Sequence, residues 1–234
     1  MYFYQINISI ISWGFLLSHT ENLDVTFVVD ISSHGISREN FDNAKKFLQN
    51  VTERLSIQSG FVRVAVILMD FDVTTEIKLN SFLNESSEYG IQNDSSVYAA
   101  IRGMEHSNEV RRRGFKLPEI LRADIWKKNG DRPNTKNVLI FLTKRIITGK
   151  RKWVSNAIKI DYGFSFMAAK LPGTPELLGN GGRNDYSSMV SGPIKGRQNP
   201  ILNMTDWQYY EEYASELVDN IYYYMFGVEK PTGT

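Results

Sequence analysis

Four strongly apolar, β-rich runs recur along the chain, separated by stretches in which apolar residues return every three to four positions. The runs cover residues 24–29, 62–69, 138–142 and 164–168. Short, nearly continuous apolar runs are typical of strands that are buried on both faces of a parallel sheet. Their alternation with helical stretches predicts an α/β fold, with a doubly wound, mostly parallel central sheet and helices on both faces.

Two of the helical stretches are clear enough to place. Ser37 is a candidate cap for a helix whose apolar face is Phe41, Ala44, Phe47, Leu48, Val51 and Leu55. Near the end of the chain, Thr205 and Gln208 have the spacing of a capping box. The helix that follows carries an apolar and aromatic face made of Tyr210, Tyr213, Ala214, Leu217, Ile221 and Tyr224. Both faces are expected to pack on the sheet.

Three further segments predict a long loop, a disordered tail and a signal peptide. Residues 171–200 are rich in Gly, Pro, Ser and Asn and show no period, which predicts a long loop, with disorder favoured. The tail, 227–234, is also predicted to be disordered. Residues 1–20 contain an apolar run, 8–17, of signal-peptide length that is too short to span a bilayer. The start lacks positive charge, so a buried amino-terminal strand or a mistaken gene start remains the alternative.

Composition narrows the functional classes. At 234 residues and 42% hydrophobic content the chain fits one domain, and its net charge of +1 gives no bulk attraction to nucleic acid or membrane. The three histidines, the absence of cysteine and the lack of a Gly-x-Ser-x-Gly motif argue against an enzyme. The absence of cysteine leaves the compartment open. Outside residues 1–20, four glycosylation triplets suit a secreted glycoprotein: Asn50, Asn84, Asn93 and Asn203.

The candidate chemistry lies directly after the first apolar run. Asp30 and Ser32 follow this run, and the carboxyl ends of strands are where α/β proteins bind ligands. Asp70 and Asp72 form a second pair of carboxylates, after the 62–69 run. They are interpreted as structural groups that bond to the backbone or cap a turn.

From residue 23 to residue 226 the chain resembles the von Willebrand factor type A domain family. The resemblance rests on 24–32, on 37–41 at the start of the first helix, on 62–72 with 75–79, on 131–143 and on the terminal amphipathic helix. It implies a doubly wound fold, with a divalent cation held by three loops at the top of the sheet.

The resemblance also identifies the ligand positions, and only part of them match. The family uses an Asp-x-Ser-x-Ser motif, a loop threonine and an aspartate after the threonine that ends the central strand. Asp30 and Ser32 match the first two ligands, whereas His34, Phe115 and Lys144 stand where the family has serine, threonine and aspartate. This implies a degenerate metal site with no cofactor, and weakened Mg²⁺ binding is the alternative.

Lys144 suggests a replacement for the lost cation. Its ammonium could pair with Asp30, since an unpaired buried carboxylate is costly. In the alternative, Lys144 points to solvent and Asp30 caps the first helix or bonds backbone amides.

Basic residues near the same edge suggest a binding surface, which comprises Arg111, Arg112, Arg113, Lys116, Lys144, Arg145 and 150–152. Such a surface would bind an extracellular matrix protein or an acidic polysaccharide. A solvated charge run balanced by Glu105, Glu109 and Asp124 is the equally weighted alternative. The expected function is that of a secreted, non-catalytic adhesion module, with neither nucleic-acid binding nor membrane insertion. A cation-dependent adhesion domain and a self-associating matrix component are the rivals.

Overall fold

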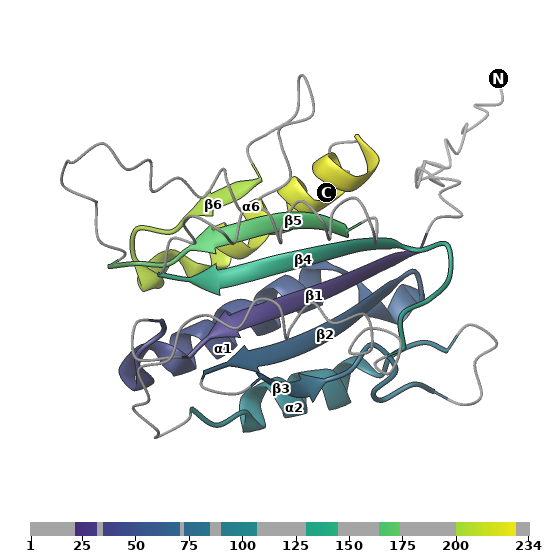
Figure 1. Ribbon diagram of the computed structural model, residues 1–234, viewed down its shortest axis with the longest axis horizontal. Helices are drawn as coiled ribbons and strands as arrows, with labels where there is room; N and C mark the ends of the chain where they lie inside the picture. The colour runs from purple at the N-terminus through teal and green to yellow at the C-terminus, as the bar shows by residue number, and fades with distance from the viewer. Residues whose placement is uncertain are drawn as a thin grey trace, which may run out of the picture.

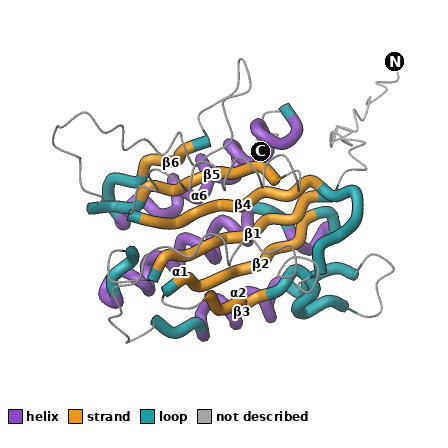
Figure 2. The backbone as a smooth tube through the Cα atoms, in the orientation of Figure 1, coloured by secondary structure: helices purple, strands orange, loops and turns teal. Residues whose placement is uncertain are grey.

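A six-stranded sheet forms the centre of the protein in the computed structural model (Figures 1 and 2), which describes residues 22–31, 35–70, 73–84, 90–106, 130–144, 164–173 and 200–227. The strand order is β3-β2-β1-β4-β5-β6. All neighbours are parallel except β3, which is antiparallel to β2. The strands are β1 (Leu23–Asp30), β2 (Val62–Met69), β3 (Val73–Ile77), β4 (Lys136–Thr143), β5 (Phe164–Lys170) and β6 (Ile201–Asn203). The predicted α/β fold with a mostly parallel sheet is confirmed.

The described helices pack on one face of this sheet (Figure 1). They are α1 (Arg38–Arg54), α2 (Asp94–Gly103) and α6 (Tyr210–Phe226), with short 3₁₀ turns at Ile57–Ser59 and Trp207–Tyr209. On β1 the side chains of Val25, Phe27 and Val29 point into the core that these helices close. All six apolar positions predicted for the first helical stretch are buried. A helix layer on the second face remains a prediction.

Two local predictions need correction, and one strand was not predicted. Ser37 stands at the cap position of α1, but its hydroxyl makes no bond to the helix backbone and instead accepts from the Asn40 side chain at 3.0 Å. The predicted capping box is wrong as well. Asp206 caps a 3₁₀ turn through the Gln208 amide, while the Thr205 hydroxyl bonds to Tyr213. Finally, β6 extends the sheet with three residues that the sequence pattern did not indicate.

The second face of the sheet carries all of the buried polar side chains on the described strands. Alternation along a strand places residues two apart on the same face, and these residues alternate with the apolar set that contacts the helices. Phe141 and Phe166 stack on this second face, with centroids 6.1 Å apart. The polar set is Asp24, Thr26, Asp30, Arg63, Asn137 and Thr143.

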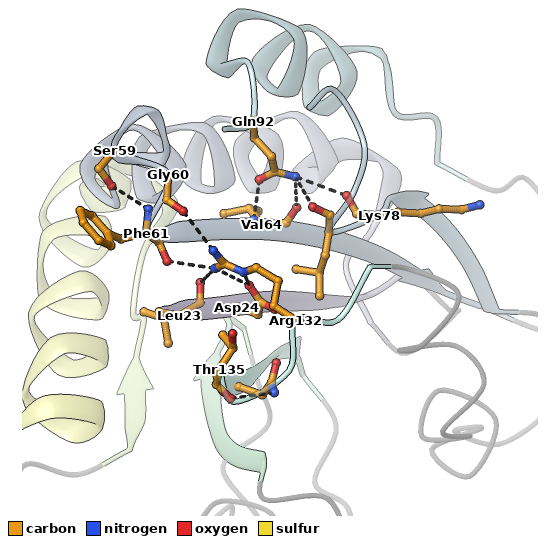
Figure 3. Close-up of polar contacts among 12 residues, drawn as sticks. Leu23, Asp24, Ser59, Gly60, Phe61, Val64, Lys78, Gln92, Arg132 and Thr135 are labelled. Atoms are coloured by element: carbon orange, nitrogen blue, oxygen red, sulfur yellow. Dashed lines mark hydrogen bonds and ion pairs between the residues drawn. The ribbon is translucent and has the colours of Figure 1, made fainter. Parts of the chain in front are cut away.

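Arg132 fastens the amino end of the sheet (Figure 3). Its guanidinium donates to the Asp24 carboxylate at 2.6 and 2.9 Å, and its backbone amide donates to the same carboxylate at 3.2 Å. Nη1 donates to the Gly60 carbonyl, and Nη2, which also bonds to Asp24, shares its two N–H groups with the carbonyls of Leu23 and Phe61; each of these three distances is 3.0 Å. Burial raises the pKa of Asp24, although the bonds from Arg132 oppose that shift. We call this arrangement the Arg132 clasp.

Gln92 satisfies the backbone of β2 beyond the point where β3 stops pairing with it (Figure 3). Its amide oxygen accepts from the Val64 amide at 2.7 Å, and its amide nitrogen donates to the Val64 carbonyl at 3.0 Å. The same nitrogen lies within 3.4 Å of the carbonyls of Lys78, Leu79 and Ser81. One buried side chain therefore takes the place of a missing strand neighbour.

Candidate functional site at the carboxyl end of the sheet

The two central strands end together in a buried hydrogen bond. Asp30 is the last residue of β1 and Thr143 is the last residue of β4, and both side chains are 0% exposed. The Thr143 hydroxyl donates to Oδ2 of Asp30 at 2.8 Å. The predicted position of Asp30 at the end of a buried strand is therefore what the fold shows.

The chain turns back tightly onto Asp30 at Gly35. The Ile36 amide donates to the Asp30 carbonyl at 2.7 Å. A Cβ on Gly35 would lie 2.0 Å from that carbonyl oxygen and 2.6 Å from Oδ1 of Asp30. Only glycine fits this close approach. The backbone of the loop is thus packed directly on the candidate carboxylate.

Lys144 follows directly after Thr143, and its side chain is partly exposed. The Nζ atom lies 3.5 Å from the point where a Cβ on Gly173 would stand, just past β5. Between Lys144 and Asp30, both of which are described, the structure records no ion pair. The arrangement therefore differs from the hypothesis that the lysine ammonium occupies the metal position beside Asp30.

Two further groups lie near the ends of the helices and strands. Oδ1 of Asp70, directly after β2, is buried and has no hydrogen-bond partner in the part of the chain described here. His106, just past α2, bonds through Nε2 to the Ile36 carbonyl at 2.8 Å and stacks edge-on against Phe41. Within the described segments, no group of three acidic or histidine side chains is placed to hold a metal ion.

Several predicted site residues lie outside the described residues. They are Ser32, His34, Arg111, Arg112, Arg113, Phe115, Lys116, Arg145 and 150–152, together with Asp72. Residues 1–20, most of the predicted 171–200 loop and most of the predicted tail also lie outside. Of the binding residues named from the sequence, the structure therefore places Asp30 and Lys144, and it places both at the same edge of the sheet.

The four glycosylation triplets fall into two kinds. Asn84, Asn93 and Asn203 are exposed, and Asn93 also caps α2 by accepting from the Ser96 amide at 2.9 Å. Asn50 lies inside α1, where its side chain donates to the Lys46 carbonyl. The threonine of that triplet, Thr52, is 0% exposed and donates to the Leu48 carbonyl.

The sequence did not indicate two groups that contact the chain next to Asp30, namely Gly35 and His106. Gly35 carries no side chain and belongs to no motif that was recognised, and the contact between His106 and Ile36 joins residues 70 positions apart. A glycine shortly after a candidate ligand was the available signal for a close backbone approach. Nothing in the local sequence indicates the partner of His106.

The described helices include none that is both long and apolar enough to cross a membrane.

The fold is similar to that of a matrix protein whose structure has been solved. One structure of proximal thread matrix protein 1 from the mussel byssus aligns with a TM-score of 0.66 at 14% identity, over 86% of this chain and 48% of that chain. A second structure of the same protein, with a zinc-occupied MIDAS motif, aligns with a TM-score of 0.64 at 15% identity.

Sequence comparison finds relatives among collagen and matrilin chains. The mouse collagen alpha-6(VI) chain is 30% identical over 120 residues, which cover 51% of this chain and 5% of that one. Chicken matrilin-1 is 23% identical over 175 residues, which cover 74% of this chain and 31% of that one. The chain therefore spans less than a third of the length of these relatives. A family model described as the von Willebrand factor type A domain matches residues 24–216, so the chain belongs to that family.

Proposed function

We propose that this domain is a secreted, non-catalytic interaction module that binds an acidic matrix protein or polysaccharide at the carboxyl end of its sheet, without a metal ion. The similarity to collagen and matrilin chains supports a role in the extracellular matrix. In this proposal residues 1–20 are a signal peptide, and the exposed Asn84, Asn93 and Asn203 carry glycans.

The observation that carries the proposal is the position of Lys144. Its ammonium stands at the edge where α/β proteins bind their ligands, beside Gly173 rather than against Asp30. The Asp30 carboxylate is engaged by the Thr143 hydroxyl. The lysine charge thus remains available to an anionic group on a partner, to which Arg145 and 111–113 would add further positive charge.

The described donors fit a divalent cation poorly. Mg²⁺ prefers a near-octahedral set of oxygen ligands, and Asp30 and Thr143 already bond to each other. Lys144 stands where the family has an aspartate, and a fixed positive charge near a divalent ion is repulsive. These features support binding without a metal.

Replacing Lys144 tests the proposal. The Lys144→Ala variant should bind immobilised heparin, a sulfated polysaccharide, more weakly than the wild type does, and the retention of the wild type should fall steeply as salt rises. Lys78→Ala is the matched control, because Lys78 is an exposed lysine just past the edge strand β3, whose last residue, Ile77, pairs with Val66 in the middle of β2 and so lies away from the carboxyl end. Equal retention of both variants would contradict the proposal.

Cation-dependent binding is the second candidate, and Asp70 is the observation in its favour. A buried carboxylate oxygen without a hydrogen-bond partner is costly, and a cation at this edge would satisfy it. The mussel structure with a zinc-occupied MIDAS motif shows that the fold accommodates a metal in that protein.

The thermal midpoint in EDTA and in millimolar Mg²⁺ separates the two candidates. A cation held only by the folded state at 100 times its Kd would add about 2.7 kcal/mol of stability. We expect the midpoint to stay unchanged. A rise with Mg²⁺ that disappears in Asp30→Asn would replace the metal-free proposal with the cation-dependent one.

A further inference from the structure

Phe82 lies exposed on the surface in an uncommon backbone conformation. Among the described residues three large apolar or aromatic side chains are exposed, and Phe82, at 41%, is one of them; the others are Phe61 and Tyr209. The φ angle of Phe82 is 60°, in the left-handed region that a bulky side chain rarely adopts because it is strained there. Neither Phe61 nor Tyr209 has such a backbone. A strained residue of this kind often marks a functional position.

A short antiparallel ladder places Phe82 beside Asn93. Leu83 pairs with Gln92, and the Asn93 amide donates to the Phe82 carbonyl at 2.8 Å. Gln92 faces inward, where its side chain bonds to Val64 of β2 (Figure 3). Successive side chains of an extended segment point to opposite sides, so Asn93 faces outward, and it is exposed. Phe82 and Asn93 are therefore neighbours on the outer side of this ladder.

The side chain of Asn93 is held in a way that suits a glycan. Its Oδ1 accepts from the Ser96 amide at 2.9 Å and so caps α2. Its Nδ2, the atom to which an N-linked sugar is attached, makes no hydrogen bond within the described residues. The triplet that directs this attachment is Asn93, Asp94 and Ser95, and Ser95 is exposed. A sugar on Nδ2 would leave the cap of α2 in place.

The first sugar of such a glycan has the chemistry to pack on Phe82. The ring of N-acetylglucosamine carries C–H groups on its faces, and the electron-rich face of an aromatic ring attracts them. Covering Phe82 would also remove apolar surface from water. Directly opposite residues on antiparallel strands have Cβ atoms about 4.5 to 5.5 Å apart, a span that one sugar ring linked to Asn93 covers.

We infer that Phe82 is a carbohydrate contact, on which the first N-acetylglucosamine of a glycan on Asn93 packs. The inference rests on the proposed function, in which the chain is secreted and Asn93 carries a glycan. In that modification Nδ2 of Asn93 loses one proton to the transferring enzyme and forms a bond to C1 of the sugar. The bond from C1 to a lipid-linked diphosphate breaks, and the diphosphate leaves with the electron pair. The contact joins the start of α2 to the turn at Phe82 and stabilises both.

Thermal unfolding of the full chain, made in secreting animal cells and in bacteria, tests the inference. Ser95→Ala removes the glycosylation triplet but keeps the Asn93 cap. Among secreted preparations the wild type should melt about 2 to 4 °C above Ser95→Ala, as one modest stabilising contact produces in a domain of this size. Among bacterial preparations, which lack the glycan, the two should melt together. Mass spectrometry of the peptide that contains Asn93 measures its occupancy.

Substitutions of the aromatic residue assign that shift to Phe82. Phe82→Ala should abolish the difference that Ser95→Ala makes in the secreted chain, whereas Phe82→Trp should retain it. Tyr209→Ala is the matched control. It removes another exposed aromatic side chain, in the turn that follows β6 and precedes α6, and should leave the difference unchanged.

Three results would overturn the inference: no glycan on Asn93, equal midpoints of the secreted wild type and Ser95→Ala, or a shift that survives Phe82→Ala. If secreted Ser95→Ala still gained stability through Phe82, the contact would belong to a glycan on Asn84 and the inference would be wrong. Heparin retention through Lys144 is a separate measurement. Its absence beside an intact Phe82 shift contradicts only the polyanion proposal, and an occupied Asn93 without the shift contradicts only the carbohydrate contact.

Discussion

Asp24 and Asp30 stand at opposite ends of the same strand, on the same face and nearly equally buried, at 1% and 0% exposure. Asp24 receives two side-chain bonds and one backbone bond from Arg132. Asp30 accepts a neutral hydroxyl from Thr143, while the nearby cation, Lys144, lies elsewhere. A buried aspartate at a strand end is thus a structural group at one edge and a candidate binding group at the other.

The difference lies in how the local charges are arranged. At the amino end the Arg132 guanidinium bonds to the Asp24 carboxylate and to three backbone carbonyls, so that edge is closed to a charged ligand. At the carboxyl end the positive charge is not paired with the buried carboxylate. Breaking the ion pair at the amino end should therefore cost the most stability, and removing the lysine charge at the carboxyl end should mainly alter binding.

Removing Arg132 should have the largest effect. Arg132→Ala leaves the Asp24 carboxylate buried without its cation, which costs about 3 to 5 kcal/mol of unfolding free energy. Urea unfolding monitored by circular dichroism measures this change. Arg102→Ala, at an exposed position on α2, is the control and should stay within about 0.5 kcal/mol of the wild type. A loss below about 1 kcal/mol for Arg132→Ala would show that the clasp is not what stabilises this edge.

Gln92→Leu should come next. The substitution leaves the amide and carbonyl of Val64 without their side-chain partner, at about 1 to 3 kcal/mol for each buried group. The same urea titration applies. Gln58→Leu, which removes an exposed bond to Asp94, should change little. If both variants behaved alike, water would be replacing the Gln92 amide.

Thr143→Val tests whether the carboxyl edge also depends on its polar contact. The substitution removes the hydroxyl that bonds to Asp30, and hydrogen bonds to charged groups contribute about 1.5 to 3 kcal/mol. Thr143→Ser keeps the hydroxyl and should recover most of the stability. A larger loss than that of Arg132→Ala would reverse the comparison between the two ends.

Lys144→Ala should have the smallest effect on stability, within about 0.5 kcal/mol, although it is the variant expected to bind heparin more weakly. Chemical unfolding and heparin retention measured on the same preparation give both values. Substantial destabilisation would mean that the lysine supports the fold after all.

Much of the fold followed from the sequence because the β-rich runs are buried on both faces and α1 has a regular apolar face. The short strands β3 and β6 were harder to predict. β6 has three residues and is held by the register of β5, and so short a segment carries no period of its own. The predicted capping box failed because Asp206 caps a 3₁₀ turn that precedes α6, while the Thr205 hydroxyl bonds to Tyr213.

Only part of the candidate site could be predicted. Asp30 was found because its position at a strand end is a local property, and Lys144 because it departs from a family motif. The Arg132 clasp was missed because its partners are more than 70 positions away along the chain. Whether the Lys144 ammonium contacts Asp30 depends on how the residue after β4 lies relative to Gly173, just past β5. No pattern in the sequence indicates that arrangement.

Lys136 links the two described ends of the chain at one edge of the sheet. Its backbone amide donates to the Asn22 carbonyl at 3.0 Å, and its ammonium donates to the Met225 carbonyl at 3.0 Å. The two described ends of the chain, residues 22 and 227, therefore lie near the same edge as the Arg132 clasp. Tension applied through residues 22 and 227 would enter and leave at that edge, so the carboxyl edge at the far end of β1 would lie outside the path of the load.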